Sequence, residues 1–313
     1  MNRKNILHIS KILLLFLSIS YLIDKVVYFG LRKLENEVFT GQSVGKFNHY
    51  LAIKDSLDLV VFGSSRANHH VNPSLITKKG YNMGFDGQKI AFSAAILKLL
   101  SKNKQTILFH IDPENAVDNS YSAEDLSSLR VLYNKNEIIK EEIDKYSKIN
   151  PLQKFYWSIS YNGIVFGIIK NYLTPKYEHN SYNGFDPLPV NEIQMNQNYE
   201  TIEKTIDEEC KITLLKLNPV YQSYLADIRE FCFMNDKKII FFTSPKLFDK
   251  CKSDNLFVRH EMKKMNLNYI DFSDIFNSAS DLSNWKDATH LSDKGAKNFT
   301  NQISRTIFGY ELE

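Results

Sequence analysis

Short apolar runs that alternate with helical patterns are the feature of this sequence that most constrains its fold. Each run ends at small or polar turn residues, and longer segments between the runs carry apolar residues at helical spacing. An uninterrupted run rich in β-branched and aromatic residues is typical of a strand buried on both faces. Strands alternating with helices predict an α/β fold whose parallel sheet has helices on both faces. The expected strands are Leu57–Phe62, Tyr81–Met83, Thr106–Ile111, Lys238–Phe242 and Asn268–Phe272, and the expected helices are Lys89–Leu100, Tyr221–Met234 and Phe248–Met265.

The segment from about residue 119 to residue 218 interrupts this alternation. It holds three stretches with helical or aromatic patterns, Glu124–Ile149, Trp157–Leu173 and Glu200–Leu217. We predict a helical insertion that caps the sheet, because insertions in α/β folds sit at the C-terminal ends of strands, where ligands bind. The alternative is that these helices simply cover a larger sheet.

A basic N-terminus followed by an apolar stretch predicts a membrane-directed segment. Ile12–Leu31 is 20 residues long and is broken mainly by Asp24 and Lys25. A helix of 20 residues is about 30 Å long, the thickness of a bilayer's hydrocarbon core. A span that starts nearer Ile6 would instead let the Lys11 amine extend towards the near interface.

We predict an uncleaved signal anchor within residues 1–35, followed by one catalytic domain over residues 50–313. A cleaved signal peptide and a helix of a soluble protein are the alternatives. Three basic residues precede the uninterrupted run Ile12–Ile23, and three follow it, namely Lys25, Arg32 and Lys33. The positive-inside rule therefore does not orient the segment. A short basic tail usually stays cytoplasmic, which favours a single-pass protein in the cell membrane with an extracytoplasmic catalytic domain.

Composition narrows the class of protein further. The net charge of +3 comes from 39 basic and 36 acidic residues of mixed order, which argues against a nucleic-acid partner held by a strong positive field. A mean hydropathy of −0.32 argues against several membrane spans. The three cysteines, Cys210, Cys232 and Cys251, lack metal-ligand spacing, so we expect free thiols and no metal or other cofactor.

The turn after the first expected strand is the first stretch with candidate chemistry. It reads Gly63-Ser64-Ser65-Arg66. Glycine adopts backbone conformations that other residues avoid, and a serine just past it can present its hydroxyl and its N–H at the C-terminal edge of the sheet. Such turns are common, so this one alone indicates little.

A second stretch, Tyr81–Gln88, holds Gly84 and Gly87 after the second expected strand. Glycines let a backbone N–H approach a ligand closely, as an oxyanion hole requires. Ordinary turn glycines are the simpler interpretation of this stretch by itself.

The third stretch precedes the C-terminal helix and contains Asp287 and His290. A carboxylate three residues before a histidine can hold one ring nitrogen while the other nitrogen faces a serine hydroxyl. Ser292 is the expected N-cap of the following helix and would fix this loop. A surface turn is the simpler interpretation of Asp-x-x-His alone.

In this order, the three stretches resemble the SGNH/GDSL hydrolase superfamily from about residue 57 to the C-terminus, without the middle insertion. The resemblance implies a flavodoxin-like three-layer α/β/α fold with about five parallel strands. It implies Ser65 as nucleophile, His290 as base and Asp287 as the residue that orients His290. The Ser65 and Gly87 N–H groups would then form the oxyanion hole.

The superfamily has a third sequence motif, called its third block, and this chain departs from it. This block supplies an Asn to the oxyanion, but the third expected strand is followed here by Asp112-Pro113-Glu114-Asn115. Asn115 is the remaining candidate, because a carboxylate repels a developing negative charge. Arg66, His69 and His70 are candidates for contact with an anionic glycan, and a structural ion pair is the alternative for Arg66.

With its leading anchor, the chain looks like the branch of this superfamily that modifies bacterial cell-surface polysaccharides, including DltD-like and alginate O-acetylation proteins. The resemblance implies a serine esterase or O-acyltransferase, with acetyl as the expected group, acting on acylated polysaccharide or glycan. A membrane-bound protein that donates acyl groups is an expected partner. The alternative is a catalytically silent glycan-binding or scaffold protein of a polysaccharide-assembly system.

Overall fold

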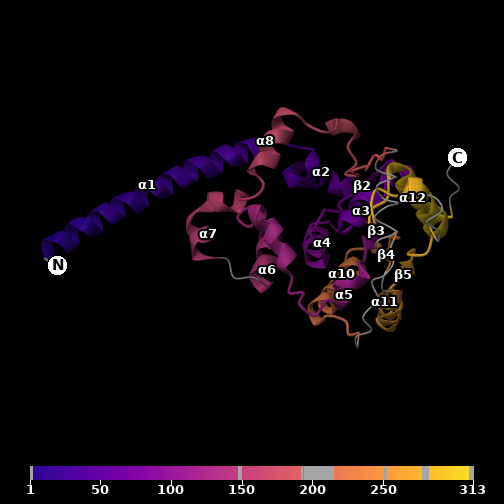
Figure 1. Cartoon of the computed structure of the whole chain (residues 1–313). Coiled ribbons are helices and arrows are strands. Elements are labelled where there is room, and N and C mark those ends of the chain that lie inside the picture. The colour runs from indigo at the N-terminus through magenta and orange to yellow at the C-terminus, as the bar shows by residue number, and fades with distance from the viewer. Residues whose placement is uncertain are drawn as a thin grey trace. The chain divides into compact units, whose positions relative to one another are not determined.

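The computed structural model describes residues 3–146, 150–191, 193, 215–247, 249, 252–276 and 282–309 (Figure 1). The chain divides into two compact units. We call Met1–His49 with Leu129–His179 the anchor unit, and Tyr50–Ser128 with Asn180–Glu313 the sheet unit. The anchor unit thus takes in the centre of the segment expected as an insertion.

The sheet unit is built on five parallel strands. Their order is β2-β1-β3-β4-β5, with Leu59 opposite both Gly80 and Thr106, and Ile107 opposite Ile239. This is a doubly wound order. The chain adds β2 on one side of β1 and adds β3, β4 and β5 on the other side, so the direction of strand addition reverses between β1 and β3. The predicted α/β class and its five parallel strands are confirmed. The strands are β1 (Leu59–Phe62), β2 (Gly80–Asn82), β3 (Gln105–His110), β4 (Lys237–Thr243) and β5 (Tyr269–Asp271).

Helices lie on both faces of the sheet, because side chains of buried strands alternate between the two faces. Val61, Leu108 and Phe242 pack in one core cluster with residues of α3 and α12. On the other face α10 packs against β4 and against α4, as Figure 1 shows. The helices are α3 (Ser65–His70), α4 (Ile90–Leu97), α5 (Pro113–Val117), α10 (Pro219–Met234), α11 (Lys252–Lys264) and α12 (Asp293–Phe308).

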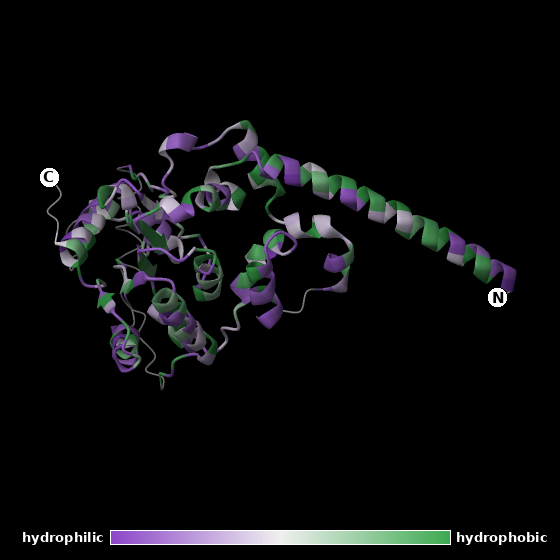
Figure 2. Ribbon diagram, turned by 180° about the vertical axis from the view of Figure 1, so that it is seen from behind, coloured by the Kyte–Doolittle hydropathy of each residue, from purple (hydrophilic) through white to green (hydrophobic). Residues whose placement is uncertain are grey.

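The anchor unit is dominated by α1 (Arg3–Glu35), a helix of 33 residues. It is long and apolar enough to cross a membrane, a test that signal sequences also pass. Hydrophobic residues follow one another along it (Figure 2), and its large apolar side chains from Ile6 to Ile23 are exposed. The other helices are α2 (Lys46–Ile53), which leads into the sheet unit, α6 (Glu137–Tyr146), α7 (Pro151–Phe155) and α8 (Val165–Leu173).

The helical pattern from Glu124 to Ile149 does not form one helix. A 3₁₀ helix over Glu124–Leu132 is followed by a turn, and α6 begins at Glu137. Asn136 explains the break, because its side-chain oxygen accepts a hydrogen bond from the Ile139 N–H at 3.1 Å and so caps the new helix. Most of the helix expected over Glu200–Leu217 lies outside the described residues, as do Cys210 and Cys251, whereas Cys232 is a buried free thiol.

Candidate active site

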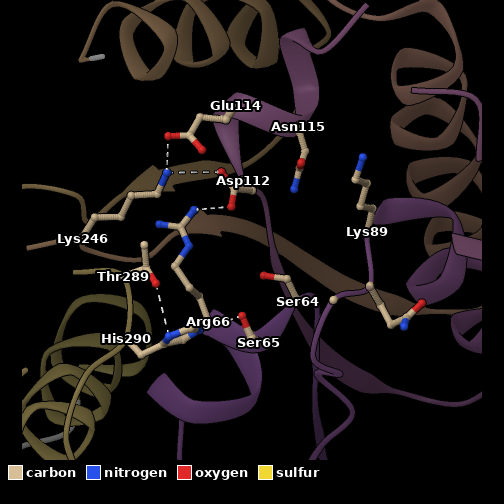
Figure 3. A pocket seen from close by; sticks show the side chains of 12 residues that line it. Ser64, Ser65, Arg66, Lys89, Asp112, Glu114, Asn115, Lys246, Thr289 and His290 are labelled. Atoms are coloured by element: carbon tan, nitrogen blue, oxygen red, sulfur yellow. Dashed lines mark hydrogen bonds and ion pairs between the residues drawn. The ribbon is translucent and has the colours of Figure 1, made fainter. Parts of the chain in front are cut away.

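The carboxyl ends of four strands and the loop before α12 surround a cavity of about 280 Å³. Ser64, Ser65 and Arg66 follow β1, and Gly87–Lys89 follows β2. Ligands of doubly wound sheets bind in the crevice at this edge, where the strand order changes direction. The remaining lining residues are Asp112, Glu114 and Asn115 after β3, Lys246 after β4, and Thr289 and His290 before α12 (Figure 3).

Gly63 makes the turn that carries the two serines. Its φ is +142°, a region that is essentially restricted to glycine. A Cβ at this position would also lie 2.6 Å from the His110 Cβ. The turn places Ser65 at the first position of α3 and Ser64 just before it. The strand and its glycine therefore fix where the hydroxyls lie.

The predicted triad residues come together at the cavity. The Ser65 Oγ lies 2.8 Å from the His290 Nε2 (Figure 3). The His290 Nδ1 lies 3.0 Å from an Asp287 carboxylate oxygen. A ring whose Nδ1–H donates to Asp287 has an unprotonated Nε2, which is able to accept the serine proton. Burial alone would raise the pKa of Asp287, but hydrogen bonds from His290 and Thr289 outweigh it and hold this pKa well below its usual value.

The loop that carries His290 is closed at its base. An antiparallel bridge joins Trp285 to Leu291, and the Lys286 N–H donates to the His290 carbonyl at 2.9 Å. The predicted N-cap is confirmed, because the Ser292 Oγ accepts from the Gly295 N–H at 3.1 Å at the start of α12. Two distant segments also hold this loop, because the Leu247 N–H donates to the Ala288 carbonyl at 3.1 Å and the Leu291 N–H donates to the His70 Nε2 at 3.0 Å.

The candidate oxyanion donors all line the cavity. Ser65 is the first residue of α3, and the first N–H groups of a helix have no intrahelical acceptor. Gly87 has a left-handed φ of +70°. Figure 3 shows the Asn115 side chain directed into the cavity. Their role in binding an oxyanion stays a prediction.

The carboxylate of Asp112 is paired rather than isolated. Arg66 lies 2.9 Å from it and Lys246 lies 3.7 Å from it. Burial would raise the pKa of Asp112, but the two cations outweigh burial and hold this pKa far below its usual value. The repulsion that the sequence predicts for Asp112 is therefore partly neutralised.

Arg66 and His69 are both buried and engaged with protein atoms. Besides its ion pair, Arg66 donates to the Ser244 carbonyl at 3.0 Å, so the alternative expected for it, a structural ion pair, is present. The two ring nitrogens of His69 lie 2.6 Å from the Asp186 carbonyl and 3.0 Å from the Asp86 carboxylate. Arg66 lines the cavity, His69 is outside its lining, and substrate contact by either stays a prediction.

Sequence reasoning missed a buried polar series beside the site. The Ser244 Oγ lies 3.1 Å from the His70 Nδ1 and 3.1 Å from the His110 Nε2. The His110 Nδ1 in turn lies 3.5 Å from the Ser64 Oγ. We call these four residues the histidine–serine series. His110 and Ser244 are polar residues at or just past apolar strands, and this signal alone would have pointed to them.

Asn82 at the end of β2 was also missed as a structural residue. Its buried amide donates to the Ala67 and Val71 carbonyls, each at 2.7 Å, and its oxygen accepts from the Gly84 N–H at 2.8 Å. It thereby ties the helix that carries Ser65 to the turn after β2. Within the described residues, no group of three or more His, Cys, Asp or Glu side chains is arranged to hold a metal ion.

No protein-family model matches the chain, and no curated protein matches it either. The resemblance to SGNH/GDSL hydrolases therefore stays a prediction from the sequence motifs.

Proposed function

We propose that this protein is a membrane-anchored serine esterase or O-acyltransferase that acts on acylated polysaccharide of the cell envelope or on exopolysaccharide. The observation that carries the proposal is the hydrogen-bonded series Ser65–His290–Asp287 at the mouth of the cavity. Nucleophilic catalysis needs a hydroxyl, a base within reach and a group that orients the base. The strand order and the motif order support an SGNH-type fold.

The reaction would begin when the Ser65 Oγ attacks the ester carbonyl and the His290 Nε2 takes its proton. Asp287 stabilises the imidazolium, and the Ser65 and Gly87 N–H groups receive the oxyanion. Collapse of the tetrahedral intermediate expels the alcohol, which takes the proton from His290, and leaves an acyl group on Ser65. Water gives the free acid and makes the protein an esterase, whereas a sugar hydroxyl gives a new ester and makes it a transferase.

A membrane location supports the choice of substrate. With α1 as a single-pass anchor and its short basic tail in the cytoplasm, the sheet unit would lie outside the cell, where envelope polysaccharides are modified. The cavity is lined by both cations and carboxylates, which suits hydroxyl-rich sugars better than an apolar acyl chain.

A catalytically silent glycan-binding or scaffold protein is the second candidate. The observation that favours it is the Asp112 carboxylate, which lines the cavity where the superfamily's third block supplies an amide. A protein of this class would keep the cavity and lose turnover.

Hydrolysis of p-nitrophenyl acetate by the full chain in detergent separates the two candidates. We expect Ser65→Ala to abolish release of p-nitrophenol, and Ser56→Ala, a matched exposed serine just before β1, to leave it unchanged. A fluorophosphonate probe should label Ser65, located by peptide mass spectrometry. Equal release by Ser65→Ala and the unsubstituted protein, with no label on Ser65, would favour the silent protein.

A further inference from the structure

A short segment of the anchor unit wraps the side of α1. We call residues 150–161, which comprise α7 and a 3₁₀ turn, the collar. The Asp24 carboxylate on α1 accepts hydrogen bonds from the Trp157 N–H at 2.8 Å and from the Ser158 N–H at 2.9 Å. Lys25 donates to the Phe155 carbonyl at 2.8 Å. The two charges that interrupt the apolar stretch are therefore satisfied by the collar.

The position of these contacts along α1 marks a boundary. Ser20 is the first α1 residue in contact, with its Oγ 2.8 Å from the Tyr156 hydroxyl. Ile6–Ile23 precedes the charged pair, and its 18 residues make about 27 Å of helix, within the range that spans a bilayer. The span that starts near Ile6 thus agrees with the contacts, and the collar lies at its end.

The collar has the side chains of a membrane–water interface. The Tyr21 and Phe155 rings lie 4.9 Å apart, and the Lys25 amine lies 4.1 Å from the Trp157 ring. Aromatic residues and lysines gather at this depth in membrane proteins. Leu152 is 58% exposed and Phe155 is 42% exposed, so two large apolar side chains of α7 lie uncovered beside the end of the span.

We propose that the collar is a second membrane contact, which lies in the lipid interface with Leu152 and Phe155 in the acyl-chain boundary. The occupant of this apolar face is lipid, because the face continues the exposed apolar surface of α1. Asp24, bonded to the collar, then fixes the depth of the span. This proposal is independent of the catalytic one.

The fluorescence of Trp157 can report the depth of the collar in the bilayer. The sequence has one other tryptophan, Trp285, so the Trp157→Phe variant gives the emission of Trp285 by itself. The full chain is placed in phosphatidylcholine vesicles that carry bromine at a shallow or at a deep acyl position, and fluorescence quenching is compared with that of Trp157→Phe. We expect the Trp157 component to be quenched more by the shallow bromine than by the deep one. Equal emission with and without brominated lipid would overturn the proposal.

A paired substitution tests the apolar face itself. Leu152→Gln with Phe155→Gln should reduce shallow quenching of Trp157 at least twofold. Phe233→Gln is the matched control, since Phe233 is exposed on α10 of the sheet unit. If the pair of substitutions leaves quenching unchanged, a face for another protein's helix replaces lipid as the explanation.

A second, independent observation concerns which atoms of the histidine–serine series carry a hydrogen and therefore donate. The Leu291 N–H donates to the His70 Nε2 at 3.0 Å, so the hydrogen of neutral His70 is on Nδ1 and points at the Ser244 Oγ. Burial, together with the Arg66 guanidinium, holds the pKa of His70 and of His110 well below its usual range. Both rings are therefore neutral, with one hydrogen each.

The remaining hydrogens follow from this start. The Ser244 Oγ receives a hydrogen from His70, so its own hydrogen goes to the His110 Nε2. The hydrogen of His110 is then on Nδ1, which faces the Ser64 Oγ at 3.5 Å. Ser64 accepts at this contact, and its own O–H is left to donate. Figure 3 shows the Ser64 side chain directed into the cavity beside Ser65.

We infer that Ser64 is the third oxyanion donor, with its hydroxyl in the place that the superfamily's third block gives to an Asn. This inference rests on the proposed function. His110 is a positioning residue, because it acts through the Ser64 hydroxyl, and Ser64 is the catalytic residue. Asn115, which lines the same cavity, is the competing donor.

Steady-state kinetics on p-nitrophenyl acetate distinguish the donors. Ser64→Ala should lower kcat about 10²-fold with little change in KM, as expected for an oxyanion donor. Ser64→Thr, which keeps the hydroxyl, should recover at least a tenth of the rate. A loss in Asn115→Ala with none in Ser64→Ala would overturn the inference in favour of Asn115.

The positioning role of His110 has its own readout. His110→Leu should lower kcat as Ser64→Ala does, and the double variant should lose no more than either single one. Additive losses would mean that His110 does not act through Ser64. Fluorophosphonate labelling of Ser65 separates this test from the test of the proposed function. If Ser65 is labelled in the unsubstituted protein and in Ser64→Ala, the nucleophile is intact and the kinetics test the oxyanion donor. If Ser65 is not labelled even in the unsubstituted protein, the proposed function itself is refuted.

Discussion

Two carboxylates, one in each unit, have nearly the same hydrogen bonds and opposite surroundings. Asp24 accepts from the Trp157 N–H, the Ser158 N–H, the Ser158 hydroxyl and the Lys25 amine. Asp287 accepts from the Thr289 and His290 N–H groups, the Thr289 hydroxyl and the His290 ring. The side chain of Asp24 is 4% exposed, whereas that of Asp287 is 50% exposed.

The difference lies in where the donors come from. The main donors to Asp24 are more than 130 residues away in the sequence, so this carboxylate fastens two distant segments. All donors to Asp287 are within three residues, so it shapes one loop and aims one ring. The number of hydrogen bonds therefore does not distinguish a structural carboxylate from a candidate catalytic one. The two carboxylates are distinguished by the sequence separation of their donors and by the ring that Asp287 holds, since His290 lines the cavity.

The largest effect is expected at Asp287. Asp287→Asn should lower kcat on p-nitrophenyl acetate about 10³–10⁴-fold, because an amide favours the wrong tautomer of His290. The melting temperature should change little, since the carboxylate is half exposed. Thermal melts and initial rates on the same preparation check both parts. A large drop in melting temperature would mean that Asp287, like Asp24, is a structural carboxylate, and the contrast between the two residues would be wrong.

The substitution Asn82→Ala tests whether the sheet unit also contains a residue that holds separate segments together, as Asp24 does in the anchor unit. Asn82→Ala leaves the Val71 carbonyl and the Gly84 N–H without this partner, whereas the Ala67 carbonyl keeps the Val71 N–H. The loss should cost about 2 kcal/mol at roughly 1 kcal/mol for each of the two groups. Denaturant unfolding measures the loss. Activity at low temperature, where the variant is folded, should stay within a few-fold, and a loss without destabilisation would place Asn82 with Asp287 instead.

Asp24→Asn should destabilise the anchor unit by about 2 kcal/mol, because one acceptor oxygen becomes a donor that faces backbone N–H groups. Limited proteolysis in detergent should cut the collar sooner than in the unsubstituted protein. Esterase activity should be unchanged. Equal rates of cleavage in the two proteins would show that Asp24 does not fasten the collar.

The smallest effect is expected at His69. Burial would lower its pKa, but hydrogen bonds to Asp86 and to the Asp186 carbonyl outweigh burial and raise this pKa. Folding therefore favours the protonated ring, and its contribution is present below about pH 6.5 and is lost as pH rises through the folded-state pKa. Because Asp86 is half exposed, the contribution should stay below about 1 kcal/mol. His69→Gln should flatten the pH dependence of unfolding in this range.

Local patterns in the sequence predicted the sheet. They also selected Ser65, His290 and Asp287, which the structure brings within hydrogen-bonding distance and whose catalytic role stays a prediction. All five strands begin and end within two residues of the apolar runs, because a buried strand has to be apolar along its whole length. Part of the loop before α12 was predictable for a related reason. The contact of the His290 ring with Asp287 and the bond from the Gly295 N–H to Ser292 each join residues three apart in the sequence.

Contacts between distant residues were beyond such patterns. Nothing in the spacing of Asp24 and Trp157 indicates that they meet, and the grouping of residues 129–179 with α1 depends on contacts of this kind. The order of hydrogens from Leu291 to Ser64 likewise needs the position of two rings that lie 40 residues apart in the chain, at His70 and His110. The departure in the third block was visible, but the residue that we infer to compensate for it, Ser64, was not.

The backbone conformation and the close packing at Gly63 limit which second mutations could restore a variant at this position. The Gly63 φ of +142° and the 2.6 Å approach of the His110 Cβ forbid a side chain there for two separate reasons. Because the nearest atom is a Cβ, only glycine at position 110 would remove this contact, and the Ala67 Cβ at 3.0 Å and the backbone reason would remain. A suppressor screen that starts from Gly63→Ala should therefore yield reversion to glycine and no second-site change at position 110.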